Sequence, residues 1–297
     1  MEKGLVSIVI PTHKGYDNIK RAVISALSQT YRTIEVIVVD DNGLGTEDQL
    51  KTEDELKCFV NDPRFKYVPH EHNINGSAAR NTGIKNSNGE YVAFLDDDDE
   101  YTNDNIQNHV NRLYSMPSEF AMTYCGMELY APNKVVQTIM PQVEGDVLFD
   151  FLCGRIRIGS SLLLVKRSAI DEINGFDESF RRHQDWEFIV RILNNHKIAL
   201  VNKVGVKKYN LGRNNASNAK KFEEFRLHYL DKMESIIKSF PDKEQKQIYD
   251  SHYYLIGKEY LRAKDLKNCL RWTKKTSSPI YYMCKYVIDA LKSKLKK

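Results

Sequence analysis

Cysteine is scarce in this sequence, and no hydrophobic run is long. The five cysteines among 297 residues are scattered, odd in number and without a CxxC pair, which argues against a disulfide framework and against a zinc site. No apolar stretch approaches the about 20 residues that a membrane-spanning helix needs. The apolar run near the N-terminus is broken by Pro11 and is too short for a signal sequence. We therefore expect a cytoplasmic protein.

A strong excess of charge of either sign is also missing. Forty-four Lys and Arg residues face 40 Asp and Glu residues, a net charge of +4, which is too mild over this length to indicate a nucleic-acid partner. The chain is 41% hydrophobic and 28% charged. This is the composition of an ordinary globular protein that can bury one large core or two modest ones.

The first third of the chain alternates between two kinds of segment. Short β-branched runs that end in polar or acidic residues occupy 5–12, 34–41, 65–71 and 90–99. Segments with helical spacing lie between them, at 18–29 and 77–87. This βαβ order predicts an α/β fold whose sheet is covered on both faces. In such sheets ligands bind at the carboxyl ends of the strands, which are here the most polar stretches.

The composition changes near Gly212. Residues 116–212 continue with strand patterns around a helical segment at 184–196, whereas residues 213–297 are rich in Tyr, Lys and Glu with helical patterns and no strand signal. We therefore predict an α/β domain over 1–212 and a helical C-terminal region over 213–297.

Four consecutive aspartates, 96–99, follow the apolar run "YVAFL". One interpretation is a solvated turn, since runs of charged residues usually lie at the solvent-exposed surface. An EF-hand loop is excluded because Tyr101 stands where its glycine is needed. The other reading is a site for Mn²⁺ or Mg²⁺, which bind carboxylates and leave positions for phosphate oxygens. We expect a strand end here, with successive carboxylates on opposite faces, and a bound cation that relieves the repulsion of unpaired charges.

Six blocks together resemble glycosyltransferase family 2, whose members have the GT-A fold. They are "VSIVIPTHKG", "SALSQTY", "IEVIVVDDNG", "GSAARNTGI", "GEYVAFLDDDD" and "GFDESF…HQDWEF", and they occur in the family's order and approximate spacing over about residues 5–210. The resemblance implies a Rossmann-like, doubly wound mixed sheet with a helical C-terminal extension. It divides the first domain into a nucleotide-sugar-binding half, 1–115, and an acceptor half, 116–212.

The resemblance also implies roles for residues that would bind the nucleotide. The loop after the first strand would line the base and ribose pocket with Pro11, Thr12 and His13. Asp41 would accept hydrogen bonds from uracil, and Arg80 would reach over the nucleotide toward its base or phosphate. From the residues alone, Asp41 could equally end a strand and cap a helix, and Arg80 could be a surface helix residue.

The same resemblance assigns the acids. Within the family's DxD motif Asp98 would bind the metal, and Asp96 or Asp97 would contact the ribose. Asp185 would be the general base of an inverting reaction. Spacing alone also allows Asp185 to favour a helix N-terminus through the helix dipole, and it predicts a core position for Trp186 and the apolar residues after it.

Two departures from the family pattern concern charged positions. Gln184 precedes Asp185 where many relatives carry Glu, which lowers the charge around the expected base. Some relatives carry a His after the last strand, near the metal or the diphosphate. Here that place holds none, and we expect Tyr209, Asn210 or Arg213 to substitute.

The resemblance implies a metal-dependent inverting glycosyltransferase that uses a nucleotide-diphosphate sugar, with a UDP-sugar as the expected donor, and a glycan or lipid-linked hydroxyl acceptor. Bacterial surface polysaccharide or glycoconjugate synthesis is the usual setting of such proteins. The QxxRW pattern of processive synthases is missing, so we expect transfer of a single sugar.

Two alternatives stay open: a nucleotidyltransferase, and a non-catalytic sugar-nucleotide-binding or scaffold protein. The basic C-terminal segment 285–297 has an apolar face with Val287, Ile288, Leu291 and Leu295. It predicts either peripheral contact with anionic lipid at the inner membrane face or a solvated helix packed on its own domain.

Overall fold

The computed structural model describes residues 1–131, 134–209 and 218–295, without the side chains of 287 and 289–295. The chain forms two compact units, one of Met1–Val147 with Ile158–Arg213, the other of Leu148–Arg157 with Asn214–Lys297. The predicted boundary at residue 212 lies outside the described residues. Leu148–Arg157, which the sequence places in the first domain, belongs to the second unit.

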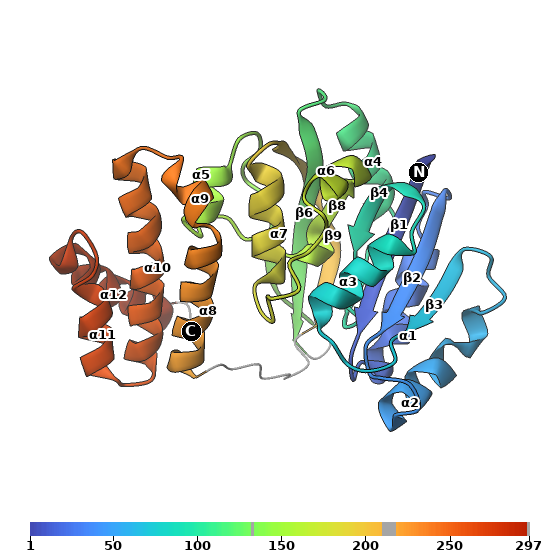
Figure 1. Cartoon of the computed structure of the whole chain (residues 1–297), viewed down its shortest axis with the longest axis horizontal. Helices are drawn as coiled ribbons and strands as arrows, with labels where there is room; N and C mark the ends of the chain where they lie inside the picture. Colours follow the sequence, from blue (N-terminus) through green and yellow to red (C-terminus); the bar gives the residue numbers. More distant parts are fainter. Residues whose placement is uncertain (132–133, 210–217, 296–297) are drawn as a thin grey trace. The chain divides into compact units, whose positions relative to one another are not determined.

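The first unit is built on one mixed sheet of nine strands (Figure 1). The strands are β1 (Glu2–Thr12), β2 (Ile34–Asp40), β3 (Phe65–Pro69), β4 (Gly89–Phe94), β5 (Asp99–Tyr101), β6 (Phe120–Ala131), β7 (Lys134–Ile139), β8 (Leu163–Lys166) and β9 (Lys197–Tyr209). Their order is β3-β2-β1-β4-β8-β6-β9-β5, and β7 pairs with β6 off this path. The predicted α/β class with a doubly wound mixed sheet is confirmed.

Strands β1 to β4 are parallel neighbours, so their carboxyl ends lie along one edge of the sheet. The continuous apolar runs fit this arrangement: Val6, Ile8, Val9 and Ile10 are fully buried, as expected for strands covered on both faces. Beyond β4 the sheet turns mixed, because β8 runs antiparallel to both β4 and β6.

Helices connect the strands of the first unit. They are α1 (Tyr16–Leu27), α2 (Glu47–Leu56), α3 (Gly76–Lys85), α4 (Asn105–Tyr114), α6 (Arg167–Glu172) and α7 (Gln184–Leu193), with short 3₁₀ turns η1 (Lys57–Phe59) and η2 (Ser160–Leu162). Figure 1 shows α3 in front of β1 and β2. Helix α2 is not expected from the sequence patterns. It is capped by the preceding residue, Thr46, whose hydroxyl accepts a hydrogen bond from the backbone amide of Gln49.

Helix α3 approaches β1 closely at Gly83. A Cβ at this position would lie 2.2 Å from Cγ1 of the buried Val9. Gly83→Ala is therefore expected to destabilise the first unit by about 1–3 kcal/mol, although alanine is the better helix former by about 1 kcal/mol. The measurement is the shift of the urea unfolding midpoint, with the exposed Lys85→Ala of the same helix as control. An unchanged or raised midpoint for Gly83→Ala would contradict this packing.

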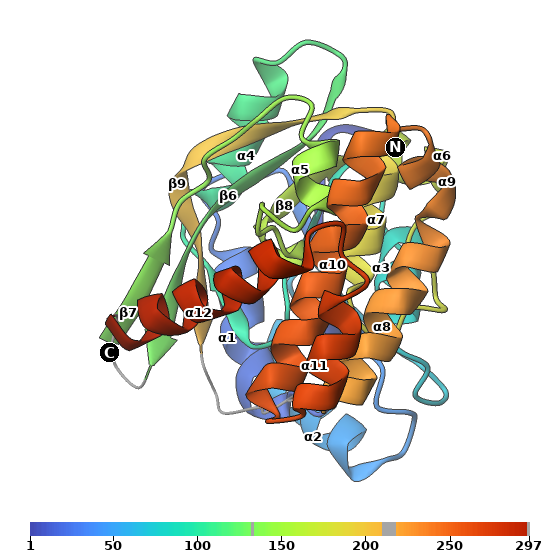
Figure 2. The same ribbon diagram turned by 90° about the vertical axis from the view of Figure 1, so that its left-hand side faces the viewer.

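The second unit is helical (Figure 2). Its helices are α5 (Leu148–Leu152), α8 (Ala219–Lys232), α9 (Glu234–Lys238), α10 (Asp242–Arg262), α11 (Leu266–Thr273) and α12 (Pro279–Leu295). Aromatic residues dominate its core, where Tyr254, Tyr260, Trp272 and Tyr286 pack together. Within the described part of the chain, no helix combines the length and the apolarity that crossing a bilayer requires. Most side chains of the basic segment 285–297 lie outside the description, so the predicted lipid contact stays a prediction.

Candidate active site

The acidic run does not continue a strand. Strand β4 ends at Phe94, and the Asp99 amide donates to the Asp96 carbonyl at 3.0 Å, which closes a turn before β5 begins. The expectation of a strand end with alternating carboxylates is therefore wrong. The turn still directs the side chains of Asp96, Asp97 and Asp99 to different partners, because a tight turn splays successive side chains.

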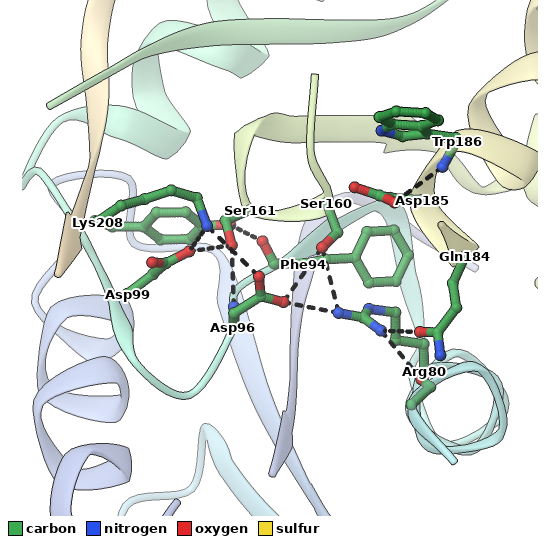
Figure 3. Close-up of polar contacts among 12 residues, drawn as sticks. Arg80, Phe94, Asp96, Asp99, Ser160, Ser161, Gln184, Asp185, Trp186 and Lys208 are labelled. Atoms are coloured by element: carbon green, nitrogen blue, oxygen red, sulfur yellow. Dashed lines mark hydrogen bonds and ion pairs between the residues drawn. The ribbon is translucent and has the colours of Figure 1, made fainter. Parts of the chain in front are cut away.

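Positive side chains compensate two of these acids (Figure 3). Arg80 donates to Asp96 Oδ1 at 2.7 Å, and Lys208 lies 2.5 Å from Asp99 Oδ2 and 3.6 Å from Asp96 Oδ2. Asp96 also accepts from the Ser160 hydroxyl, and Asp99 from the Ser161 hydroxyl. The acids were expected to be unpaired, and for Asp96 and Asp99 this is wrong. Arg80 and Lys208 relieve part of the repulsion between them within the chain, although the Asp96 charge still raises the pKa of Asp99.

The end of β1 and the residues that follow it pack against the acidic turn. The Thr12 hydroxyl donates to Asp97 Oδ2 at 2.7 Å, and both groups are buried. At Gly15 an added Cβ would lie 1.8 Å from Asp97 Oδ2. A side chain at this position would displace the Asp97 carboxylate, so glycine allows the chain to approach the turn this closely.

Asp41 follows β2 and is held by the segment before α3. Its Oδ1 accepts from the Ile74 amide at 2.9 Å and lies 2.8 Å from His70 Nδ1, while Oδ2 accepts from Asn73 at 2.9 Å. His70 in turn contacts the Thr82 hydroxyl through Nε2. Asp41 is thus fixed in orientation, with its side chain toward the ends of the parallel strands.

A pocket of about 300 Å³ lies at the carboxyl ends of β1, β2 and β4. It is lined by the residues that the sequence predicted for nucleotide and metal, together with two small residues of α3: Pro11, Thr12, His13, Asp41, Gly76, Ala79, Arg80, Asp96, Asp97 and Asp98. The backbone carbonyl of Asp98 accepts from Arg21 at 2.8 Å. Eight of the nine predicted site residues therefore surround one cavity.

The ninth, Asp185, does not line this pocket but lies in the first turn of α7, near Ser160 and the Arg80 network (Figure 3). Loss of hydration raises the pKa of its carboxyl to about 6; the Arg80 charge opposes this rise and the Asp96 charge adds to it. A carboxyl with this pKa is poised to exchange a proton near neutral pH. Gln184, the neutral departure from the family pattern, accepts from Arg80 at 2.8 Å.

Trp186 is partly exposed, so the predicted core position is wrong for this residue, while Phe188, Ile189 and Ile192 are fully buried as predicted. The indole stacks on His183 with 4.3 Å between ring centroids. His183 has a left-handed backbone, φ 57°, and the helix begins only after it.

Three site residues were missed by the sequence analysis: Ser160, Ser161 and Lys208. Lys208 lies in β9, one residue before Tyr209, which was expected to substitute for the missing histidine. The Tyr209 hydroxyl donates instead to Glu100 at 2.7 Å, and Asn210 and Arg213 lie outside the described residues. Although burial opposes it, the charges of Asp99 and Asp96 raise the pKa of Lys208, which keeps the ammonium group charged.

The pKa values of Asp96 and Asp99 shift in opposite directions within this network. Burial alone would raise the pKa of Asp96, but Lys208 and Arg80 outweigh it and lower the pKa to about 2. Burial raises the pKa of Asp99, and Lys208 offsets this rise only in part. Asp96 is therefore a permanent anion at the edge of the pocket.

Comparisons with known sequences identify similar proteins. Residues 7–129 match the family model described as "Glycosyl transferase family 2". The chain is 33% identical over 193 residues to an "Uncharacterized glycosyltransferase" of Rickettsia bellii (strain RML369-C), which covers 63% of this chain and 27% of the relative. It is 24% identical over 273 residues, 90% of this chain and 99% of the relative, to "UDP-Glc:alpha-D-GlcNAc-diphosphoundecaprenol beta-1,3-glucosyltransferase WfgD" of Escherichia coli. The matches to the first rickettsial relatives span 27% to 58% of their length.

Solved structures share the fold. The mannosyltransferase PcManGT from Pyrobaculum calidifontis, in complex with GDP-Man and Mn²⁺, has a TM-score of 0.61 at 15% identity and covers 96% of this chain and 80% of its own. TarS 1-349 of S. aureus, in complex with UDP, has a TM-score of 0.60 at 17% identity over 90% and 89%. The sequence blocks, the family model matched over residues 7–129 and the fold shared with the solved glycosyltransferases agree, and the predicted resemblance to glycosyltransferase family 2 is confirmed.

Proposed function

We propose that this protein transfers a single sugar, with inversion, from a nucleoside-diphosphate donor to a hydroxyl acceptor. The observation that carries the proposal is the pocket at the carboxyl ends of β1, β2 and β4, which gathers the acids, Arg80 and the loop after β1. The nucleotide and nucleotide-sugar complexes of the structural neighbours support a donor site of this kind.

The donor base is proposed to be uracil, bound at Asp41. A carboxylate oxygen can accept about two hydrogen bonds, and Oδ1 of Asp41 already has two partners in the chain, whereas Oδ2 has the Asn73 amide. Oδ2 therefore retains the capacity to accept from the uracil N3–H group. Pro11, Thr12 and His13 are proposed to line the base and ribose, with Asp96 or Asp97 at the ribose hydroxyls.

The donor set around Asp98 fits a divalent cation only together with the substrate. Its ligands are carboxylate oxygens, which suit Mn²⁺ or Mg²⁺, but the described residues contain no cluster of three His, Cys, Asp or Glu side chains that would hold a metal unaided. We assign Asp98 as the protein ligand, with the remaining positions filled by diphosphate and water. When bound, the metal neutralises charge that develops on the leaving diphosphate.

Arg80 and Asp185 are proposed to act on opposite sides of the transferred sugar. Arg80 carries a guanidinium at the pocket wall, where it stabilises the leaving diphosphate electrostatically. Asp185 accepts the proton of the acceptor hydroxyl as that oxygen attacks the anomeric carbon. A single displacement of this kind breaks the bond between the anomeric carbon and the diphosphate oxygen and inverts the configuration.

The acceptor is proposed to be a glycan or a lipid-linked saccharide of bacterial surface polysaccharide synthesis. The printed names of related proteins support this setting, among them the amylovoran biosynthesis enzyme AmsB of Erwinia amylovora, 29% identical over 62% of each chain, and WfgD. A cytoplasmic location, with contact to the inner membrane face through the basic C-terminal helix, is part of the proposal.

A donor panel tests the proposed function. The purified chain is incubated with UDP-, GDP- and TDP-sugars, Mn²⁺ and a mixture of saccharide acceptors, and the released phosphates are identified. Release of a nucleoside diphosphate that depends on the acceptor supports transfer. Release of pyrophosphate in the presence of a nucleoside triphosphate and a sugar phosphate would indicate a nucleotidyltransferase, and donor binding without release would indicate a non-catalytic protein.

The raised pKa of Asp185 predicts an acidic limb in the pH profile. A general base must be ionised, and the ionised fraction falls as the pH drops through about 6. We therefore expect kcat/KM to decrease about tenfold per pH unit below this value. The measurement is initial-rate kinetics between pH 4.5 and 8, with donor affinity followed in parallel. A flat profile across pH 5 to 7 would contradict the assignment.

A further inference from the structure

The second unit contains a pocket of its own, with a volume of about 490 Å³. Its walls come from the residues that directly follow α5, from α10 and from α12. The lining residues that carry charge, an aromatic ring, a hydroxyl or an amide are Arg155, Gln247, Ser251, Tyr254, Lys258, Tyr281, Tyr282 and Lys285. Its size is that of a small-molecule site.

The charge of this pocket is positive. Arg155, Lys258 and Lys285 line it, and no carboxylate is among its lining residues in the described part of the unit. Asp150 pairs with Arg155 at 2.6 Å and offsets one charge in part. Lys258 and Lys285 both lie over the Tyr254 ring, with Nζ 5.8 and 4.6 Å from its centroid. A concave surface with cations of one sign concentrates anions.

The aromatic walls carry the second part of the recognition. Tyr254 is 4% exposed and forms a rigid wall, whereas Tyr281 is 60% exposed and packs edge-on against Tyr282 with 5.0 Å between centroids. Tyrosine faces provide large apolar contact with hydroxyl groups at the rim. Gln247 and Ser251 add side chains that can bond to ligand hydroxyls.

We propose that this pocket binds an anionic saccharide, a pyranose that carries a phosphate or carboxylate group. The exposed Tyr281 ring packs against the sugar ring, Gln247 and Ser251 bond to its hydroxyls, and Lys258, Lys285 and Arg155 bind the anion. A membrane surface is less suited, because the cations converge on a cavity of small-molecule size instead of covering a flat face. The site lies entirely in the second unit and is separate from the pocket proposed for the donor.

Calorimetric titration of the full chain tests this site. The probe is glucose 1-phosphate, with glucuronate as a second anion, and saturating UDP and Mn²⁺ are present to occupy the donor pocket. We expect saturable binding, with glucose and inorganic phosphate each at least about tenfold weaker. Lys285→Gln and Lys258→Gln should each weaken binding by roughly tenfold, the typical effect of losing one charge-assisted hydrogen bond.

Matched variants and competing ligands complete the experiment. Lys243→Gln removes an exposed lysine of α10 outside the pocket and should leave the affinity unchanged, and Arg155→Gln provides a third pocket variant if one lysine variant unfolds in a melting test. Donor binding should be unaffected in all of them, so a failed donor assay and a failed saccharide assay are distinguishable. The proposal is overturned if glucose binds as tightly as glucose 1-phosphate, or if UMP binds more tightly than glucose 1-phosphate in competition. It is also overturned if the lysine variants bind glucose 1-phosphate with the parent affinity. Lys285-dependent binding to phosphatidylglycerol vesicles without saccharide binding would overturn it in favour of a membrane contact.

Discussion

Asp185→Asn is expected to reduce kcat for sugar transfer by about 10²- to 10⁴-fold and to leave donor affinity unchanged. The amide has the shape of the carboxylate and can still accept from the Trp186 backbone amide, which donates to Asp185 Oδ1 at 3.0 Å. It cannot take the proton of an attacking hydroxyl. The measurements are the rate of nucleoside diphosphate release at saturating acceptor and the donor dissociation constant by calorimetry.

The control for this variant is Asp171→Asn, which removes an exposed carboxylate of α6 that pairs with Arg167. It should transfer sugar at the parent rate. If Asp185→Asn also retains the parent rate, Asp185 is not the base. If it loses donor binding together with turnover, its role lies with Arg80 and the donor pocket. The acidic limb of the pH profile should also disappear from the residual activity of Asp185→Asn.

Much of the donor pocket is predictable from the sequence because its residues follow strands directly. Thr12, Asp41 and Asp96 each stand at or just after the end of an apolar β-branched run, and parallel strands bring such ends to one edge of a sheet. This prediction needs only the strand pattern and the order of the strands along the chain, both of which can be read from the sequence. The family resemblance then adds roles to positions that the pattern had already brought together.

The ionic network of the site is not predictable in this way. Lys208 is 109 residues from Asp99, and it reaches the acids because β5 and β9 pair with Asp99 opposite Lys208. Strand β5 has three residues and no hydrophobic pattern of its own, so its register is not visible in the sequence. Ser160 and Ser161 come from a short 3₁₀ turn, η2. From the sequence the four aspartates are consequently expected to be unpaired, although the fold places Arg80 and Lys208 beside Asp96 and Asp99.

This network also changes what the four aspartates require. Asp96 and Asp99 are compensated by Arg80 and Lys208, and Asp97 is bound by Thr12. The case for a metal therefore rests on Asp98 and the proposed diphosphate, not on the accumulation of charge. This distinction makes the contributions of the individual aspartates separable by mutation.

Asp98→Ala is accordingly expected to abolish the metal dependence of donor binding. With the proposed ligand removed, the affinity for the nucleotide donor in Mn²⁺ should fall to the value measured with a chelator, and transfer should fall by about 100-fold or more, because metal stabilisation of the leaving diphosphate amounts to several kcal/mol. The measurements are calorimetry of UDP binding with and without Mn²⁺ and the rate of diphosphate release.

The matched control is Asp54→Ala, an exposed aspartate of α2, which should retain both the metal dependence and the rate. The short ion pairs of Arg80 and Lys208 go to Asp96 and Asp99, whereas Asp98 acts on Lys208 only as a further charge, so the melting temperature of Asp98→Ala should stay close to that of the parent chain. A variant that keeps full Mn²⁺-dependent binding would contradict the assignment of the metal to Asp98. Transfer that proceeds at the parent rate in the chelator, with or without Asp98, would show that Arg80 and Lys208 supply the positive charge for the departing diphosphate on their own.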